Sequence, residues 1–132
     1  MPLPEVCTMR SENFLASLRH AIAGIVASWR TQRNLRIQLA AAVAVVVAAC
    51  ACRITRIEWA ILLMTIGSVI AAEMLNTAIE AIVDLASPEY HPLAKQAKDA
   101  SAGCVLVLAI TSIGVGLAIL GPPLWALLMR IA

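Results

Sequence analysis

The sequence contains few charged residues and few aromatic residues. Of its 132 residues, 14% are charged and 4% are aromatic, whereas 61% are hydrophobic. A soluble domain carries about 25% charged residues, so this chain has too few polar side chains to cover a soluble globule. The formal net charge of +2 is too small to indicate a nucleic-acid partner. The composition and length predict one integral membrane domain over residues 1–132.

Several motifs of common protein classes are absent. The four cysteines form no CxxC pair and have no histidine at metal-ligand spacing. They are therefore interpreted as small buried hydrophobic residues, not as a disulfide or a metal site. Neither GxxxxGK[ST] nor GxGxxG occurs in the sequence, which excludes the common phosphate-binding loops.

Hydrophobic patterns divide the chain into four predicted helices, at residues 11–31, 35–52, 57–86 and 94–120. In the first, apolar residues recur every three or four positions, which predicts an amphipathic helix in the membrane interface, with Ser11 as N-cap. The other three are long enough to cross a hydrocarbon core of about 30 Å. Gly121, Pro122 and Pro123 should end the last helix near Leu120. The predicted fold class is all-α, with one surface helix and three membrane helices.

Basic residues indicate the orientation of the chain. Seven of the ten precede the first membrane helix or lie between the second and third: Arg10, Arg19, Arg30, Arg33, Arg36, Lys95 and Lys98. Since cytoplasmic segments carry an excess of lysine and arginine, these regions and the N-terminus are predicted to lie in the cytoplasm.

A polar stripe follows one face of the second membrane helix. At about 100° per residue, an arc of roughly 100° contains Glu73, Asn76, Thr77, Glu80 and Asp84. Such residues can also mark a helix end in solvent, most plausibly at Asp84. Asn76 and Thr77 can also hold helices together in lipid.

Distance from Trp59, a predicted anchor at the outer interface, gives the depth of each acid. Glu73 is 14 residues further along, or about 21 Å at about 1.5 Å per residue, which places it inside the hydrocarbon region. A carboxylate there costs several kcal/mol unless it is paired, hydrated or neutral, and it suits a general base. Glu80 lies about 31 Å from Trp59, nearer to water, and suits a divalent cation.

Lys95, Lys98 and Asp99 share one face at the cytoplasmic start of the next predicted helix. A lysine there can bind phosphate as a point charge, and a helix N-terminus also favours anions. The alternative is a pair of lysines that only anchors the helix at the membrane surface. Opposite a stripe of carboxylates, the three residues predict a site for phosphate and metal.

These residues resemble a known family. EMLNTAIEAIVDL followed by PEYHPLAKQAKDASAG is similar to the signature of the small prokaryotic diacylglycerol kinases. The PEYHPLAK and RNLRIQ stretches resemble the branch that includes undecaprenol kinases, and the similarity covers residues 14–122. The resemblance implies a homotrimer in the bacterial cytoplasmic membrane, with composite active sites on the cytoplasmic side. It implies transfer of the γ-phosphate of ATP, with Mg²⁺, to the hydroxyl of undecaprenol or diacylglycerol.

The resemblance also implies a role for each site residue. Glu73 corresponds to the general base for the lipid hydroxyl, Asn76 to a residue that orients that site, and Glu80 to a metal ligand. Contacts with the nucleotide are implied for His20, Glu89, Tyr90, His91, Lys98 and Asp99.

One position departs from the family pattern. Gln32 stands before the RN pair, where the family usually has a second metal-binding glutamate. Since an amide oxygen is a poorer ligand for a hard cation than a carboxylate, this change implies weaker metal binding, one ion instead of two, or lost activity. Two other classes remain open from the residues alone. A small transporter would also contain an intramembrane glutamate, and a membrane scaffold would explain the hydrophobicity but not the acidic stripe.

Overall fold

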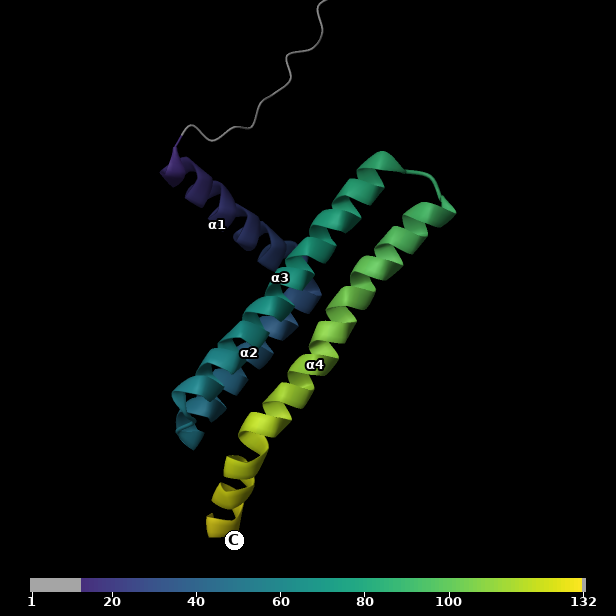
Figure 1. Cartoon of the computed structure of the whole chain (residues 1–132). Helices are drawn as coiled ribbons and strands as arrows, with labels where there is room; N and C mark the ends of the chain where they lie inside the picture. Colours follow the sequence, from purple (N-terminus) through teal and green to yellow (C-terminus); the bar gives the residue numbers. More distant parts are fainter. Residues whose placement is uncertain (1–12, 132) are drawn as a thin grey trace, which may run out of the picture.

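The computed structural model describes residues 13–131, which form four α-helices (Figure 1). The helices are α1 (Phe14–Thr31), α2 (Arg33–Cys52), α3 (Arg56–Ala86) and α4 (Pro92–Ile131). By length and composition, α2, α3 and α4 can each cross a membrane. The predicted all-α class with three membrane-span candidates is confirmed.

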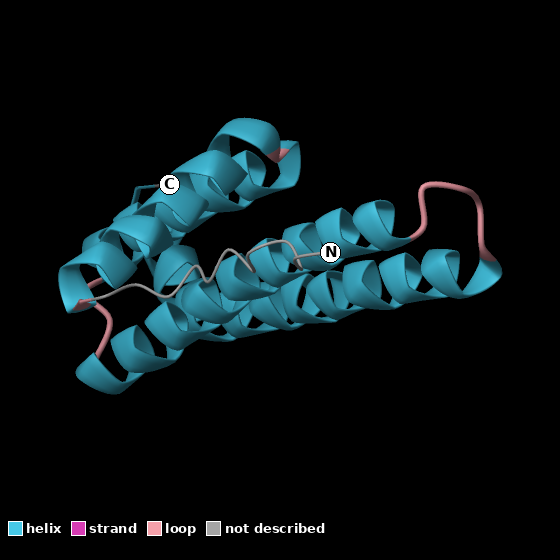
Figure 2. Ribbon diagram, turned by 90° about the horizontal axis from the view of Figure 1, so that it is seen from above, coloured by secondary structure: helices cyan, strands magenta, loops and turns pink. Residues whose placement is uncertain are grey.

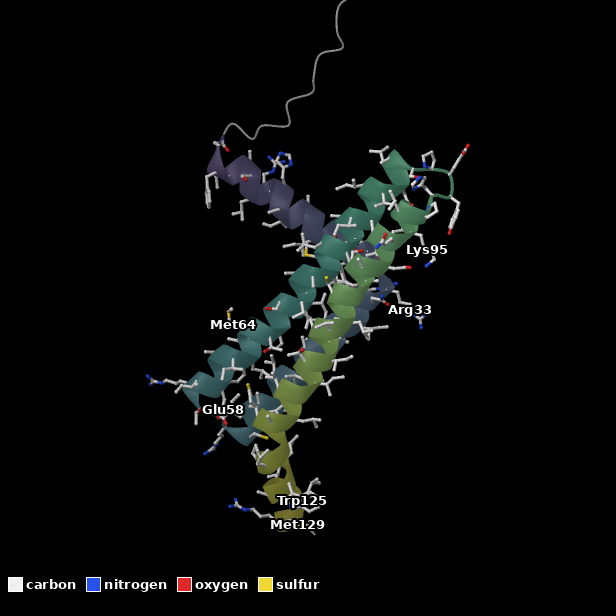
Figure 3. The ribbon with its side chains drawn as sticks, turned by 45° about the vertical axis from the view of Figure 1, so that its right-hand side comes forward. Arg33, Glu58, Met64, Lys95, Trp125 and Met129 are labelled. Atoms are coloured by element: carbon white, nitrogen blue, oxygen red, sulfur yellow. The ribbon has the colours of Figure 1, made fainter. Side chains whose placement is uncertain are left out.

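The three long helices run side by side in alternating directions, and α1 diverges from them (Figure 1). The most extensive contact joins α3 to α4. The loop between these two helices projects from one end of the bundle (Figure 2). Lys95 lies toward that end, while Glu58, Trp125 and Met129 lie toward the other (Figure 3). The lysine-rich start of α4 and the outer-side segments predicted from the sequence are thus at opposite ends.

The turn between α2 and α3 is defined by two local features. Arg53 has a left-handed backbone (φ 51°) and ends α2, a conformation common at the end of a helix. Thr55 and Glu58 form a capping box: the Thr55 Oγ1 accepts from the Glu58 N–H at 3.3 Å, and the Glu58 carboxylate accepts from the Thr55 N–H at 2.7 Å. These bonds satisfy amide groups that α3 leaves free and so stabilise its first turn. The chain reverses direction within three residues, 53–55.

The N-cap of α1 is Asn13, whose side chain accepts a hydrogen bond from the Ala16 N–H at 2.8 Å. The predicted cap, Ser11, lies outside the described residues. Asparagine is a favourable N-cap because its short side chain reaches the free amide groups of the first turn.

The prediction that the last helix ends near Leu120 is wrong, because α4 continues through Pro122 and Pro123 to Ile131. Proline has a backbone φ within the helical range; inside a helix it removes one hydrogen bond and its ring crowds the carbonyl four residues earlier, which can kink a helix without ending it. Gly121 precedes the first ring and has no Cβ to clash with it. The helix therefore resumes beyond the prolines and carries Trp125 and Arg130.

Buried side chains fall into two groups. An apolar cluster of Ala49, Leu62, Ile119 and Leu120 joins α2, α3 and α4. Further along the bundle, Leu35 and Val69 are buried, together with the two buried polar residues of the described part of the chain, Glu73 and Ser101. Most other large apolar side chains face outward, as expected for helices surrounded by lipid or by other subunits. The three-helix packing therefore buries a carboxylate and a hydroxyl together.

Candidate active site

Glu73 is held inside the bundle by the packing of α3. Its residue surface is 2% exposed, and its Oε2 accepts a hydrogen bond from the Gln38 Nε2 of α2 at 3.2 Å. Among the described residues, no other side chain donates to this carboxylate. A buried carboxylate is costly unless it is compensated. The structure therefore pairs Glu73 through one oxygen only.

Asn76 links α4 to the next acid of the stripe. The Ser101 hydroxyl donates to the Asn76 Oδ1 at 2.6 Å, and the Asn76 Nδ2 donates to the Glu80 Oε1 at 3.2 Å. One amide therefore holds two neighbours and orients the Glu80 carboxylate. Thr77 has a different role: its hydroxyl donates to the Glu73 carbonyl of its own helix at 3.0 Å. Asn76 therefore joins α3 to α4 and also contacts Glu80. The Thr77 hydroxyl makes no bond to another helix in the described structure.

The two carboxylates lie at different depths along α3. Glu73 and Glu80 are separated by seven residues, or about 10 Å at about 1.5 Å per residue. Seven residues are close to two turns of helix, so both acids lie on the same face of α3. Asn76 lies between them and contacts Glu80. This arrangement provides a deep carboxylate next to α2 and a shallower one toward the α3–α4 loop.

A cavity of about 400 Å³ lies at the α3–α4 loop. Its lining includes four residues predicted to contact the nucleotide: Glu89, Tyr90, His91 and Lys98. Asp84 also lines it and forms an ion pair with Lys98 across the two helices. Cationic, aromatic and hydrogen-bonding side chains thus meet around one open space.

His91 and Pro92 define the start of α4 at this cavity. Pro92 is the first helical residue, a position that requires no N–H donor. The His91 Nδ1 accepts a hydrogen bond from the Leu93 N–H at 3.2 Å. An Nδ1 that accepts is unprotonated, so the other ring nitrogen, Nε2, is the donor. His91 therefore both caps the helix and offers an N–H to a ligand.

Three predicted site residues do not line the loop cavity themselves. Asp99 forms an ion pair with Lys95, which does line the cavity. His20 lies on α1 and lines a separate groove with Arg19. Gln32 joins α1 to α2, and its backbone N–H donates to the Ser28 carbonyl at 2.8 Å.

No side-chain hydrogen bond joins Gln32 to Glu80 in the described part of the chain. Residues 13–131 also contain no group of three or more histidine, cysteine, aspartate or glutamate side chains that could hold a metal ion. A single copy therefore assembles the carboxylate stripe and the loop cavity, whereas His20 lines a separate groove and Gln32 makes no side-chain hydrogen bond to Glu80 in the described structure.

Two polar residues of the site were not predicted. Gln38 is the one polar residue in an otherwise apolar stretch, residues 37–52. The sequence therefore marks Gln38 as unusual, but it does not show which residue Gln38 contacts. Ser101 gave no signal, because serine is common on helices that cross a membrane. Both were found only because the structure places α2 and α4 against α3.

Comparison with known proteins identifies the family of this chain. A family model described as prokaryotic diacylglycerol kinase matches residues 19–120. An undecaprenol kinase of Bacillus subtilis (strain 168) is 46% identical over 84% of this chain and 90% of its own length. A diacylglycerol kinase of Synechocystis sp. is 43% identical over 97% of this chain and 74% of its own length. The diacylglycerol kinase of Escherichia coli (strain K12) is 34% identical over 68% of this chain and 74% of its own length.

The protein is therefore an ATP-dependent membrane lipid kinase. It belongs to the prokaryotic diacylglycerol kinase family, which also contains undecaprenol kinase. The transporter and scaffold alternatives are set aside by this result.

The link between Ser101 and Asn76 should contribute to stability. We expect Ser101→Ala to lower the free energy of unfolding by about 1 kcal/mol, because it removes the donor to a part-buried amide oxygen. Thermal unfolding in detergent micelles would measure the change.

Ser112→Ala is the matched control, because the Ser112 hydroxyl donates only to the Ala109 carbonyl of its own helix, at 2.7 Å. It should have a smaller effect than Ser101→Ala. Equal losses of unfolding free energy in the two variants would show that the Ser101–Asn76 hydrogen bond adds no stability.

Proposed function

We propose that this kinase transfers the γ-phosphate of ATP to the hydroxyl of undecaprenol at the cytoplasmic surface of the bacterial membrane. The observation that carries the reaction is the buried Glu73 carboxylate, which has one oxygen paired to Gln38 and the other without a side-chain donor in the described structure. The relation to an undecaprenol kinase over most of both chains favours undecaprenol as the acceptor. Diacylglycerol is the second candidate, because two of the relatives described above are named diacylglycerol kinase.

The proposed mechanism assigns Glu73 as the general base. Its unpaired oxygen takes the proton of the lipid hydroxyl while the hydroxyl oxygen attacks the γ-phosphorus, and ADP leaves. Asn76 keeps the neighbouring acid in place through its bond to Glu80 and is itself held by Ser101. Phosphoryl transfer depends mainly on positioning and charge neutralisation, so fixed side chains of this kind suit the reaction.

The loop cavity is the proposed nucleotide site. Lys98 supplies a positive charge for phosphate, and Asp84 holds its ammonium group near the cavity. His91 offers its Nε2–H, while Glu89 and Tyr90 line the same space. His20, Asp99 and the α1–α2 junction are proposed to complete the site from neighbouring copies of the chain in a homotrimer. The placement of His20 in a groove on α1, away from the loop cavity, supports this assignment.

The oxygen ligands available in this chain suit one magnesium ion bound together with ATP. Glu80 presents a carboxylate, and Gln32 has an amide oxygen; both are hard oxygen ligands. Mg²⁺ is commonly bound by one or two carboxylates, with phosphates and waters as the other ligands, so one glutamate is sufficient for one ion bound with ATP. When present, the ion would offset negative charge on the phosphate oxygens.

The depth of the two acids fits the two substrates. Glu73 lies deeper in the bundle, where a lipid hydroxyl arrives from the membrane, and Glu80 lies about 10 Å nearer to the loop. The distribution of basic residues in the sequence supports a cytoplasmic location for both acids. ATP then enters from water, and each substrate stays in its own phase.

The first test is Glu73→Gln. Removing a general base should lower the rate of lipid phosphorylation by about 10²–10⁴-fold, while the protein remains folded because a glutamine side chain can still hydrogen-bond with Gln38. The rate would be measured in mixed micelles with labelled ATP.

Glu58→Gln makes the same chemical change on the same helix, at the end far from the site (Figure 3). It should retain nearly the full rate. A Glu73→Gln enzyme that keeps more than about a tenth of the wild-type rate would exclude Glu73 as the base.

The second test concerns Gln32. We expect Gln32→Glu to lower the magnesium concentration that gives half-maximal rate several-fold, because a carboxylate binds a hard cation better than an amide does. Gln96→Glu adds the same charge at an exposed position of α4 and is the control. An identical magnesium titration for wild type and Gln32→Glu would place residue 32 away from the metal.

A further inference from the structure

Gln38 is the polar residue of α2 that meets the buried acid of α3. Its Nε2 donates to the Glu73 Oε2 at 3.2 Å, across 35 positions of sequence. Its Oε1 is the one side-chain nitrogen or oxygen in residues 13–131 that is buried and has no hydrogen-bond partner. A buried polar atom without a partner costs free energy comparable to a lost hydrogen bond. This feature therefore requires an explanation.

Gln38 is the polar side chain of its cavity that has an atom without a hydrogen-bond partner. A cavity of about 350 Å³ between α2, α3 and α4 is lined by apolar side chains, with Gln38, Thr65 and Ser112 as the exceptions. The Thr65 hydroxyl donates to the Ile61 carbonyl at 2.8 Å, and the Ser112 hydroxyl is likewise satisfied within its own helix. These two residues need no partner on another helix, whereas half of the Gln38 amide lacks one.

The Gln38 amide presents its donor to Glu73. Its NH₂ group donates to the Glu73 Oε2, and a carboxylate oxygen is a hydrogen-bond acceptor. The opposite orientation would place two oxygens together and lose the bond. The unpaired Oε1 is thus the consequence of directing the donor at Glu73. A side chain present only to join two helices would be expected to have both ends paired.

We propose that Gln38 is a positioning residue for the lipid kinase reaction. Its N–H fixes the Glu73 Oε2, so the carboxylate is held in one orientation and its second oxygen is presented to the lipid hydroxyl. The inference rests on the proposed role of Glu73 as the general base. Gln38 itself contacts the base and not the reacting atoms. It acts by lowering the population of Glu73 side-chain conformations that cannot react.

The test is Gln38→Met, which has a similar length and no hydrogen-bond donor. We expect kcat to fall by about 10- to 100-fold, the effect of losing a hydrogen bond to a charged group. The KM for ATP should change by less than about twofold, because the nucleotide site is built from other residues. Gln38→His restores an N–H donor and should recover a large part of kcat.

Thr65→Val is the matched control in the same cavity, because its hydroxyl bonds only to its own helix. It should leave kcat within about twofold of wild type. Thermal unfolding of each variant in micelles separates a loss of positioning from a loss of folded protein. A Gln38→Met enzyme with wild-type kcat would overturn the proposal, as would a Gln38→His enzyme that is folded and no faster than Gln38→Met.

Combination with Glu73→Asp gives an independent readout. Aspartate is one methylene shorter and withdraws the carboxylate from Gln38, so adding Gln38→Met to Glu73→Asp should lower kcat little further. Multiplicative losses would show that Gln38 acts on something other than Glu73. If Glu73→Gln alone keeps its activity, the proposed base is wrong. If Glu73→Gln is inactive and Gln38→Met is fully active, only the inference about Gln38 fails.

Discussion

Burial of a carboxylate within three apolar helices is the constraint on which the rest of the site depends. Glu73 is 2% exposed and has one side-chain donor in the described structure, on a different helix. In a hydrocarbon region such a group requires compensation from protein, and here α2 must pack against α3 to supply it. Loss of that packing would leave a buried carboxyl group without its side-chain donor, so the fold of the bundle and the geometry of the proposed base are coupled.

The second layer of polar contacts extends this arrangement toward water. Ser101, Asn76 and Glu80 connect α4 to the acidic face of α3, and Asp84 and Lys98 connect the same helices beside the loop cavity. Polarity thus increases from the buried base to the open end of the bundle. A lipid alcohol and a nucleotide require environments of opposite polarity, and a single helix with acids at two depths offers both.

Much of this arrangement could be predicted from the sequence, and the failures have physical causes. Apolar runs predict membrane helices because length and composition decide whether a helix can cross a bilayer, and helical spacing places Glu73 and Glu80 on one face. The extension of α4 beyond Pro122 was missed, because a proline can kink a helix without ending it and Gly121 has no Cβ to clash with the following ring. The Gln38–Glu73 pair was missed because it depends on the register of two helices, which periodicity within either one does not determine.

The proposed lipid kinase reaction is tested most directly by a phosphorylation assay on purified, folded protein in mixed micelles. Labelled ATP and magnesium would be supplied, with undecaprenol and diacylglycerol in separate reactions. Label should enter undecaprenol, and its incorporation should depend on the magnesium concentration. Label in diacylglycerol alone would contradict the proposed acceptor, and label in neither lipid would contradict the proposed reaction.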